Sequence, residues 1–310
     1  MLGVAAFLVL GALLRWLRIL RPTFDRSLLR LIIGGLMPAF IVGLIAGNEA
    51  LRDPIRVILP PVVGFFSIVL GFGFAAIAIR LVRSRQPMSL AAQRTFIFTV
   101  GIQNYGYIAA PIVALLFGTE SLAVLFIHNV GVDLAFWTVG VLVMTGHFSR
   151  QTLLRAINPP SIAILLALAA NWSGLAPHIP HELIDALRIV GQVSIPLGLI
   201  LIGATAFDHL HEARIRESLP MVFAASGLRL GLIPLCILLI AIVLPGSDDL
   251  KKVMIVQAAM PSGVFAIIMA KQYQGDTPTA MRIILTTNIV CLLTTPIWLP
   301  IGMALVGVSR

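Results

Sequence analysis

Two stretches of this sequence decide how the chain folds: Gly101-Ile-Gln-Asn-Tyr-Gly-Tyr-Ile-Ala-Ala-Pro111 and Gln257-Ala-Ala-Met-Pro-Ser-Gly263. Each lies in the middle of a long apolar run, yet each combines glycine and proline, which loosen a helix, with polar side chains. A backbone group left without a hydrogen bond in hydrocarbon is costly. The two stretches therefore predict broken transmembrane helices whose irregular backbone faces protein or a water-filled cavity.

The composition around these stretches requires lipid as the solvent. Hydrophobic residues make up 59% of the 310 residues and charged residues 11%, against roughly a quarter charged in ordinary soluble domains. At about 20 residues for each crossing, the chain holds about ten transmembrane helices and no sizeable soluble domain. The net charge of +9 is divided among short clusters, a pattern that does not indicate a nucleic-acid partner. The two cysteines lie in apolar runs and indicate no metal or other cofactor.

Charge and turn clusters divide the chain into ten predicted spans, near 1–20, 28–46, 56–82, 93–117, 121–146, 157–174, 183–206, 218–244, 251–273 and 280–306. One set of alternate loops contains fifteen lysine and arginine residues, and the other set contains five. The richer set comprises Arg15–Arg30, Arg80–Arg94, Arg150 with Arg155, Arg214 with Arg216, and Lys271 with Arg282. The positive-inside bias places this set in the cytoplasm. We therefore expect a multi-pass protein of the cell inner membrane with both termini outside the cytoplasm.

The two halves of the chain show a sparse internal repeat. The run from Arg30 to Pro38 aligns with the run from Arg188 to Pro196, so that arginine and proline recur at the same separation. A similar shift pairs glycines and alanines of the fourth and ninth spans, namely Gly106 with Gly263, Ala109 with Ala266 and Gly118 with Gly275. Five spans is an odd number, so residues 1–155 and 156–310 would form two repeats of opposite orientation, as in many secondary transporters.

At these motifs the sequence resembles the auxin efflux carrier family, which includes the plant PIN-type exporters and bacterial carriers of malonate- or malate-like acids. The most specific part is Gln257-Ala-Ala-Met-Pro-Ser-Gly-Val followed by Ala270-Lys-Gln-Tyr273, which is similar to the PIN-type runs Ala-Ala-Leu-Pro-Gln-Gly and Ala-Lys-Glu-Tyr. The separation of Asn104 from Pro111 also matches the family's first crossover. One position departs from the plant pattern, because Ala266 stands where plant members have a second proline. We expect the second break to be less sharp for that reason.

The resemblance implies an all-α membrane protein of ten transmembrane helices in two inverted five-helix repeats. Helices four and nine would cross at their breaks beside the substrate. Spans 1, 2, 6 and 7 would form a scaffold that dimerises, with Pro38 and Pro196 on its two matched helices. Spans 3–5 and 8–10 would form a moving transport domain. The implied function is secondary transport of a small organic anion, either an auxin-like aromatic carboxylate or a dicarboxylate, by an elevator movement.

Polar residues at the two breaks are the predicted substrate-binding residues. Half-helix N-termini carry partial positive charge and free N–H groups, so a crossover site favours a carboxylate without needing a lysine. Asn104 could cap a half-helix, but its position beside the break favours substrate contact. The predicted binding set is Gln103, Asn104, Tyr105, Asn129, Gln257 and Ser262, and the crossovers themselves are marked by Gly106, Pro111, Pro261 and Gly263.

Two formal charges lie near the predicted membrane midplane, Asp133 in the fifth span and Arg229 in the eighth. Buried charges in lipid are costly and usually functional. We expect them to form an ion pair, which either holds helices together or couples transport to an ion. His128 could shuttle protons, although a core role is the plainer interpretation. Thr286, Thr287 and Asn288 could complete an ion site, while threonine bonding to its own helix is the simpler account.

Three other classes of protein fit the sequence less well. An enzyme would need a nucleophile with a base, and Ser262 lacks the G-x-S-x-G setting. A channel does not require inverted repeats with two broken helices. A sodium-coupled symporter of the bile-acid type shares the expected architecture, but typically has an acidic residue near the second break. None occurs between Gln257 and Ala270.

Overall fold

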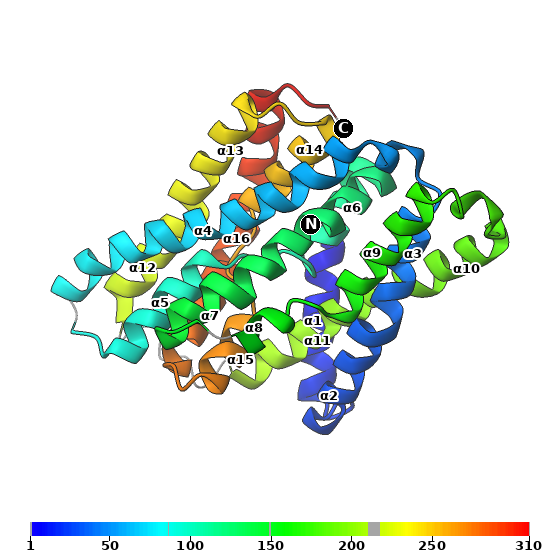
Figure 1. The fold of residues 1–310 in the computed structure, drawn as a ribbon. Coiled ribbons are helices and arrows are strands. Elements are labelled where there is room, and N and C mark those ends of the chain that lie inside the picture. Colours follow the sequence, from blue (N-terminus) through cyan, green and yellow to red (C-terminus); the bar gives the residue numbers. More distant parts are fainter. Residues whose placement is uncertain (1, 86, 149, 210–217, 310) are drawn as a thin grey trace.

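The computed structural model describes residues 2–85, 87–148, 150–209 and 218–309, and the described part is helical (Figure 1). The first half contains α1 (Leu2–Trp16), α2 (Pro22–Leu31), α3 (Met37–Ile45), α4 (Pro54–Arg85), α5 (Leu90–Gly101), α6 (Ala109–Ala135), α7 (Val141–Thr145) and α8 (Arg150–Leu154). The second half contains α9 (Pro159–Trp172), α10 (His181–Gln192), α11 (Ser194–His209), α12 (Leu219–Gly227), α13 (Ile233–Val243), α14 (Asp248–Ala258), α15 (Phe265–Gln272) and α16 (Thr277–Val306). Arg214 and Arg216, counted above among the cytoplasmic charges, lie outside the described residues.

Within the described residues, six continuous helical stretches are long and apolar enough to cross a membrane. They are Pro22–Ile45, Pro54–Ser84, Ala109–Thr145, His181–Asp208, Leu219–Val243 and Thr277–Val306. Large apolar side chains such as Leu115, Val243 and Leu293 are more than 70% exposed, as expected of a surface that faces lipid rather than water. The chain is therefore a multi-pass membrane protein.

Several predicted boundaries differ from the structure for local reasons. The second span begins at Pro22 rather than near residue 28, because proline fits the first turn of a helix and the charged turn after it is helical. The first helix ends at Trp16, and the chain turns at Arg18, whose φ is 59°. Gly118, with φ 82° and ψ −170°, interrupts α6 where the fourth and fifth spans were expected to separate. Such a φ is readily adopted only by glycine.

Three helices pass through short π-helical segments, Ile32–Leu36, Phe136–Gly140 and Leu228–Leu232. Two of these segments precede a proline, Pro38 and Pro234, which cannot donate the next helical hydrogen bond. The carbonyl of Leu230, four residues before Pro234, instead accepts from Trp298 Nε1 at 2.7 Å. An indole from α16 thus fixes the irregular turn that contains Arg229.

The helices pack as two groups. In one group α1 lies along α11, and α3 lies against α9 and α10. Glycines allow these close approaches, since a Cβ on Gly11 would lie 2.0 Å from the carbonyl oxygen of Ile200, and one on Gly191 would lie 2.2 Å from the Phe40 nitrogen. Arg15 joins three helices of this group through ion pairs with Asp25 at 2.6 Å and Asp208 at 3.2 Å.

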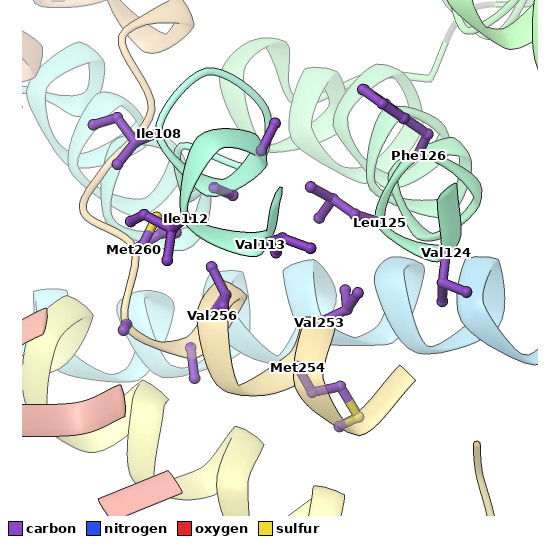
Figure 2. Packing of buried hydrophobic residues seen from close by; sticks show 14 of the residues in the cluster. Ile108, Ile112, Val113, Val124, Leu125, Phe126, Val253, Met254, Val256 and Met260 are labelled. Atoms are coloured by element: carbon purple, nitrogen blue, oxygen red, sulfur yellow. The ribbon is translucent and has the colours of Figure 1, made fainter. Parts of the chain in front are cut away.

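In the second group α4 packs along α6 and α5, and α14 packs against α6, α13 and α16. Figure 1 shows α3, α9 and α10 on one side of the molecule and α12 and α13 on the other. Figure 2 shows the packing of α6 against α14, where Val113 and Leu125 lie close to Val253 and Val256. The irregular segments that follow α5 and α14 are therefore held from both sides by apolar packing.

Candidate substrate site at the two helix breaks

The two breaks lie against each other. One runs through residues 102–108, between α5 and α6, and the other through 259–264, between α14 and α15. They pair in antiparallel fashion at Gln103 and Ser262. The amide of Asn104 donates to the Pro261 carbonyl at 2.8 Å, and the amide of Gly263 donates to the Ile102 carbonyl at 3.0 Å. The second break is nearly as long as the first, so the expectation drawn from Ala266 was wrong, and Ala266 lies buried in α15.

The crossover glycines and prolines fill different local needs. A Cβ on Gly263 would lie 2.9 Å from the Gln103 carbonyl oxygen, so close pairing requires glycine there, whereas Gly106 has open space. Pro111 lies in the first turn of α6, where a missing N–H leaves no helical bond unmade. Pro261 accepts the crossover bond from Asn104 through its carbonyl.

Four of the predicted binding residues form one hydrogen-bonded amide network. Gln257 Nε2 donates to Asn129 Oδ1 and to the Tyr105 carbonyl, both at 3.1 Å. Asn129 Nδ2 donates to the same carbonyl at 3.0 Å, and Gln103 Nε2 lies 3.4 Å from Gln257 Oε1. His128 Nδ1 lies 3.4 Å from Asn129 Oδ1 and is buried. The first break, α6 and α14 are thereby linked at the crossing point.

Asn104 and Ser262 keep unused hydrogen-bonding groups in this region. Asn104 Oδ1 accepts from the Ile108 amide at 3.3 Å, which is the capping role considered above, while its buried Nδ2 has no partner among the described residues. Ser262 Oγ is also without a partner there. Buried polar groups in proteins are nearly always hydrogen-bonded. Of these two residues, only Asn104 is among those that line the cavity described below.

For Thr287 and Asn288 the structure favours the simpler account given above, bonding to their own helix, over an ion site. Thr287 Oγ1 donates back to its own helix and accepts from the Ser262 amide at 3.3 Å. Asn288 Nδ2 donates to Ile284 and Ser262 carbonyls. Both residues therefore support the second break from α16.

A cavity of about 680 Å³ reaches the first break from one side. It lies between the two helix groups, with α2, α3, α9 and α11 on one wall and residues 102–107, α6 and α15 on the other. Its polar lining includes Gln103, Asn104, Asn129 and Asp133, and its apolar lining includes Phe126 and Trp137. Among the described residues, the cationic side chains of Arg26, Arg155 and Lys271 also line it, and so does the carboxylate of Asp25. The cavity has the size and mixed lining of a small-molecule site.

The predicted ion pair between Asp133 and Arg229 is not formed. Asp133 accepts from the Tyr105 hydroxyl at 2.6 Å and from Asn158 Nδ2 at 3.0 Å. Arg229 Nη1 instead lies 3.4 Å from Gln103 Oε1. Equal depth in the membrane suggested a pair, but α6 and the eighth span present these side chains to different neighbours. Asp133 faces the cavity, and Arg229 lies behind the first break.

Sequence reasoning missed several residues of the site. Asn158 caps α9 by accepting from the Ser161 amide at 3.0 Å and also binds Asp133, which joins α9 to α6. The Asn-Pro-Pro run at 158–160 is a recognisable helix start, but its contact with Asp133 has no local signal. The rings of Tyr107 and Phe265 stack 6.5 Å apart across the two breaks, and Arg155 lies 5.8 Å from the Trp137 ring.

A membrane-spanning helical fold with paired helix breaks beside a lined cavity is typical of membrane transporters. Residues 144–299 match the family model described as membrane transport protein. The chain belongs to this family, to which the auxin efflux carriers also belong. An uncharacterized transporter of Methanothermobacter thermautotrophicus is 27% identical over 304 residues, covering 96% of this chain and 95% of that protein. The family recognised from the sequence is confirmed, and the protein is a transporter rather than an enzyme.

Proposed function

We propose that this protein is a secondary active transporter that carries a small organic carboxylate across the cytoplasmic membrane by an elevator-type movement. The observation that carries the proposal is the cavity between the two helix groups, which ends at the amides of the paired breaks and whose described lining has three cationic side chains against two carboxylates, Asp25 and Asp133. Amide N–H groups and cations favour a carboxylate, and apolar walls suit its organic part.

The packing supports a division into a scaffold and a transport domain. Spans 1, 2, 6 and 7 correspond to α1, α2 with α3, α9, and α10 with α11, which pack mainly among themselves. The remaining helices carry both breaks. With the two shorter apolar helices Ala6–Trp16 and Pro159–Trp172, and the interrupted α5–α6 and α14–α15, the chain would cross the membrane ten times. The π-helical turn before Pro38 and the interruption at Val193 fall at matched positions of repeats 1–155 and 156–310, which supports inverted repeats.

The charges support an orientation as well. Arg26, Arg155 and Lys271 line the cavity and belong to the loops that the positive-inside bias assigns to the cytoplasm. The conformation would thus be open toward the cytoplasm, with both termini on the opposite side of the inner membrane. An anion would be drawn to the basic opening by long-range attraction.

Transport into sealed vesicles tests the proposal directly. Purified protein in liposomes should take up labelled indole-3-acetate, malonate or malate, assayed at two pH values with and without sodium. Uptake of at least one acid above protein-free liposomes is expected, and the ion dependence separates proton, sodium and uncoupled mechanisms. Uptake of none of the acids, by protein that remains folded in the membrane, would contradict the proposed function.

Asn104 provides a point test of the site. Asn104→Ala should weaken carboxylate binding by about tenfold, the loss expected of one good hydrogen bond, because the free Nδ2 group is removed. The fold should survive, since the side chain makes one long bond of its own. Asn104→Asp keeps the capping oxygen but adds a negative charge, so it should bind still more weakly. Unchanged affinity in folded Asn104→Ala, measured by calorimetry or thermal shift, would remove Asn104 from the site.

We further propose that the scaffold forms a homodimer in the lipid bilayer. On α10 the side chains of Leu183, Ile189 and Val190 are more than half exposed, and nothing in the transport movement requires this face to stay free. With the native cysteines replaced, Val190→Cys should cross-link between two copies in membranes. Val243, at the end of α13, is 78% exposed. Val243→Cys is the matched control and should not cross-link. Equal cross-linking of both, or of neither, would count against a dimer through this surface.

A further inference from the structure

Arg229 is a buried charge without a carboxylate partner. Its side chain has 0% exposure, and no carboxylate of the described residues lies within 4.0 Å of it. Its only hydrogen bond among those residues is the 3.4 Å contact of Nη1 with Gln103 Oε1. Nε and Nη2 have no partner there. Because arginine stays charged in proteins, this arrangement leaves a positive charge without a carboxylate partner among the described residues, directly behind the cavity-lining side chain of Gln103.

The local helix geometry places this charge behind the first break. Arg229 lies in the π-helical segment Leu228–Leu232, which contacts α4, α5 and α16. The Trp298 indole holds that segment through the Leu230 carbonyl. A π-helical turn redirects side chains relative to an α-helix and is frequent at functional sites. The guanidinium therefore points at the crossover rather than at lipid.

The position of Arg229 agrees with the way the amides of the network face. A guanidinium only donates, so the atom of Gln103 nearest to it must be the oxygen. Gln103 Nε2 is then turned toward Gln257 Oε1, and Gln257 Nε2 toward the Asn129 and Tyr105 oxygens. The chain of hydrogen bonds starts at the only fixed charge in it. The Tyr105 carbonyl, which can only accept, fixes the same orientation from the other end through Gln257.

We propose that Arg229 makes this site selective for anions: from behind the Gln103 side chain, its buried positive charge favours a substrate that brings a carboxylate into the cavity. This inference rests on the proposed function, because it concerns the charge of the molecule that occupies the same site. It assigns to Arg229 a role in substrate selection through its charge, and no structural ion pair.

The test compares Arg229→Met, which removes the charge at similar length, with Arg229→Lys, which keeps it. Binding of indole-3-acetate and of its neutral amide, indole-3-acetamide, is measured to each purified protein, with malonate as a second anion. Wild type should prefer the carboxylates. Arg229→Met should lose about tenfold or more of carboxylate affinity, the loss of a charge-assisted interaction, while affinity for the amide stays within about twofold of wild type. Arg229→Lys should retain a preference for the carboxylates.

Stability separates this role from a structural one. An uncompensated buried charge opposes folding, so unliganded Arg229→Met should melt at the same temperature as wild type or higher. A structural ion pair would give the reverse. Folded Arg229→Met with undiminished carboxylate preference would overturn the inference, and so would a lower melting temperature of the unliganded variant. If wild type binds none of the acids, the proposed function fails, and the melting temperatures alone decide whether Arg229 is uncompensated.

Discussion

Replacing Gly131 by alanine is expected to remove the folded protein almost completely. A Cβ at this position would lie 1.7 Å from the carbonyl oxygen of Pro61, a backbone atom of α4 that no rotamer change can move. The neighbouring contact of Gly64 with the His128 carbonyl, at 2.2 Å for an added Cβ, shows that α4 and α6 approach closely along this face. Overpacking of a core costs about 1–3 kcal/mol and sometimes more, and a clash between two backbones belongs at the upper end.

Gly73→Ala is the matched control for this prediction. Gly73 lies inside α4, as Pro61 does, but an added Cβ would find no atom within 4 Å. Alanine should be neutral there or stabilise the helix by up to about 1 kcal/mol. The readout is the yield of monodisperse protein in detergent together with its melting temperature. Equal values for Gly131→Ala and Gly73→Ala would mean that the close contact of α4 and α6 is not as described.

The second large effect is expected at Asp133 and Asn158, which connect α6 to α9. Asp133 accepts hydrogen bonds on both carboxylate oxygens. An asparagine offers only one oxygen, so in Asp133→Asn the new side-chain N–H groups would face one of the two donors. A buried group left unpaired costs about 1–3 kcal/mol. Asn158→Asp should also be unfavourable, because it would place two carboxylates side by side.

Exchanging the two residues should restore the contact. In Asp133→Asn with Asn158→Asp, the new aspartate can still cap α9, as this residue type does well, and can accept from the new asparagine. The coupling between the two sites should therefore be favourable and within the range of about 0.5–3 kcal/mol found for contacting residues. Melting temperatures of the four proteins, with uptake by the same four in vesicles, measure it. Strictly additive losses would contradict the contact. Combining Asp133→Asn with Arg229→Gln should bring no such rescue.

The positions of the spans and of the two breaks were predictable because they depend on local composition. Apolar runs set the spans, and glycine, proline and amides mark Gly101–Pro111 and Gln257–Gly263. Gln103, Asn129 and Gln257 could be named in advance, since amides at mid-depth require partners. The prediction of a less sharp second break, drawn from Ala266, failed because that break is held by backbone pairing with the first and does not depend on another proline.

The partners of the charged residues could not be predicted. Depth along a helix can be read from the sequence, whereas the direction in which a side chain points depends on helix rotation and packing. Asp133 was therefore paired with the wrong residue, and the π-helical turn that directs Arg229 toward Gln103 depends on Trp298, almost 70 residues away in the chain. The cationic lining by Arg26, Arg155 and Lys271 was missed because those residues were read only as signs of orientation.

The pairing of residues 102–104 with 261–263 has a consequence for how such a site can arise. Each break frees backbone N–H and C=O groups that lipid cannot satisfy, and each break satisfies part of the other's need through the bonds of Asn104 and Gly263. Neither interruption would be tolerable in a helix standing alone. A pair of interrupted helices is thus the smallest unit in which these freed backbone groups find partners at this depth. A change that straightens one helix leaves backbone groups of the other without hydrogen bonds.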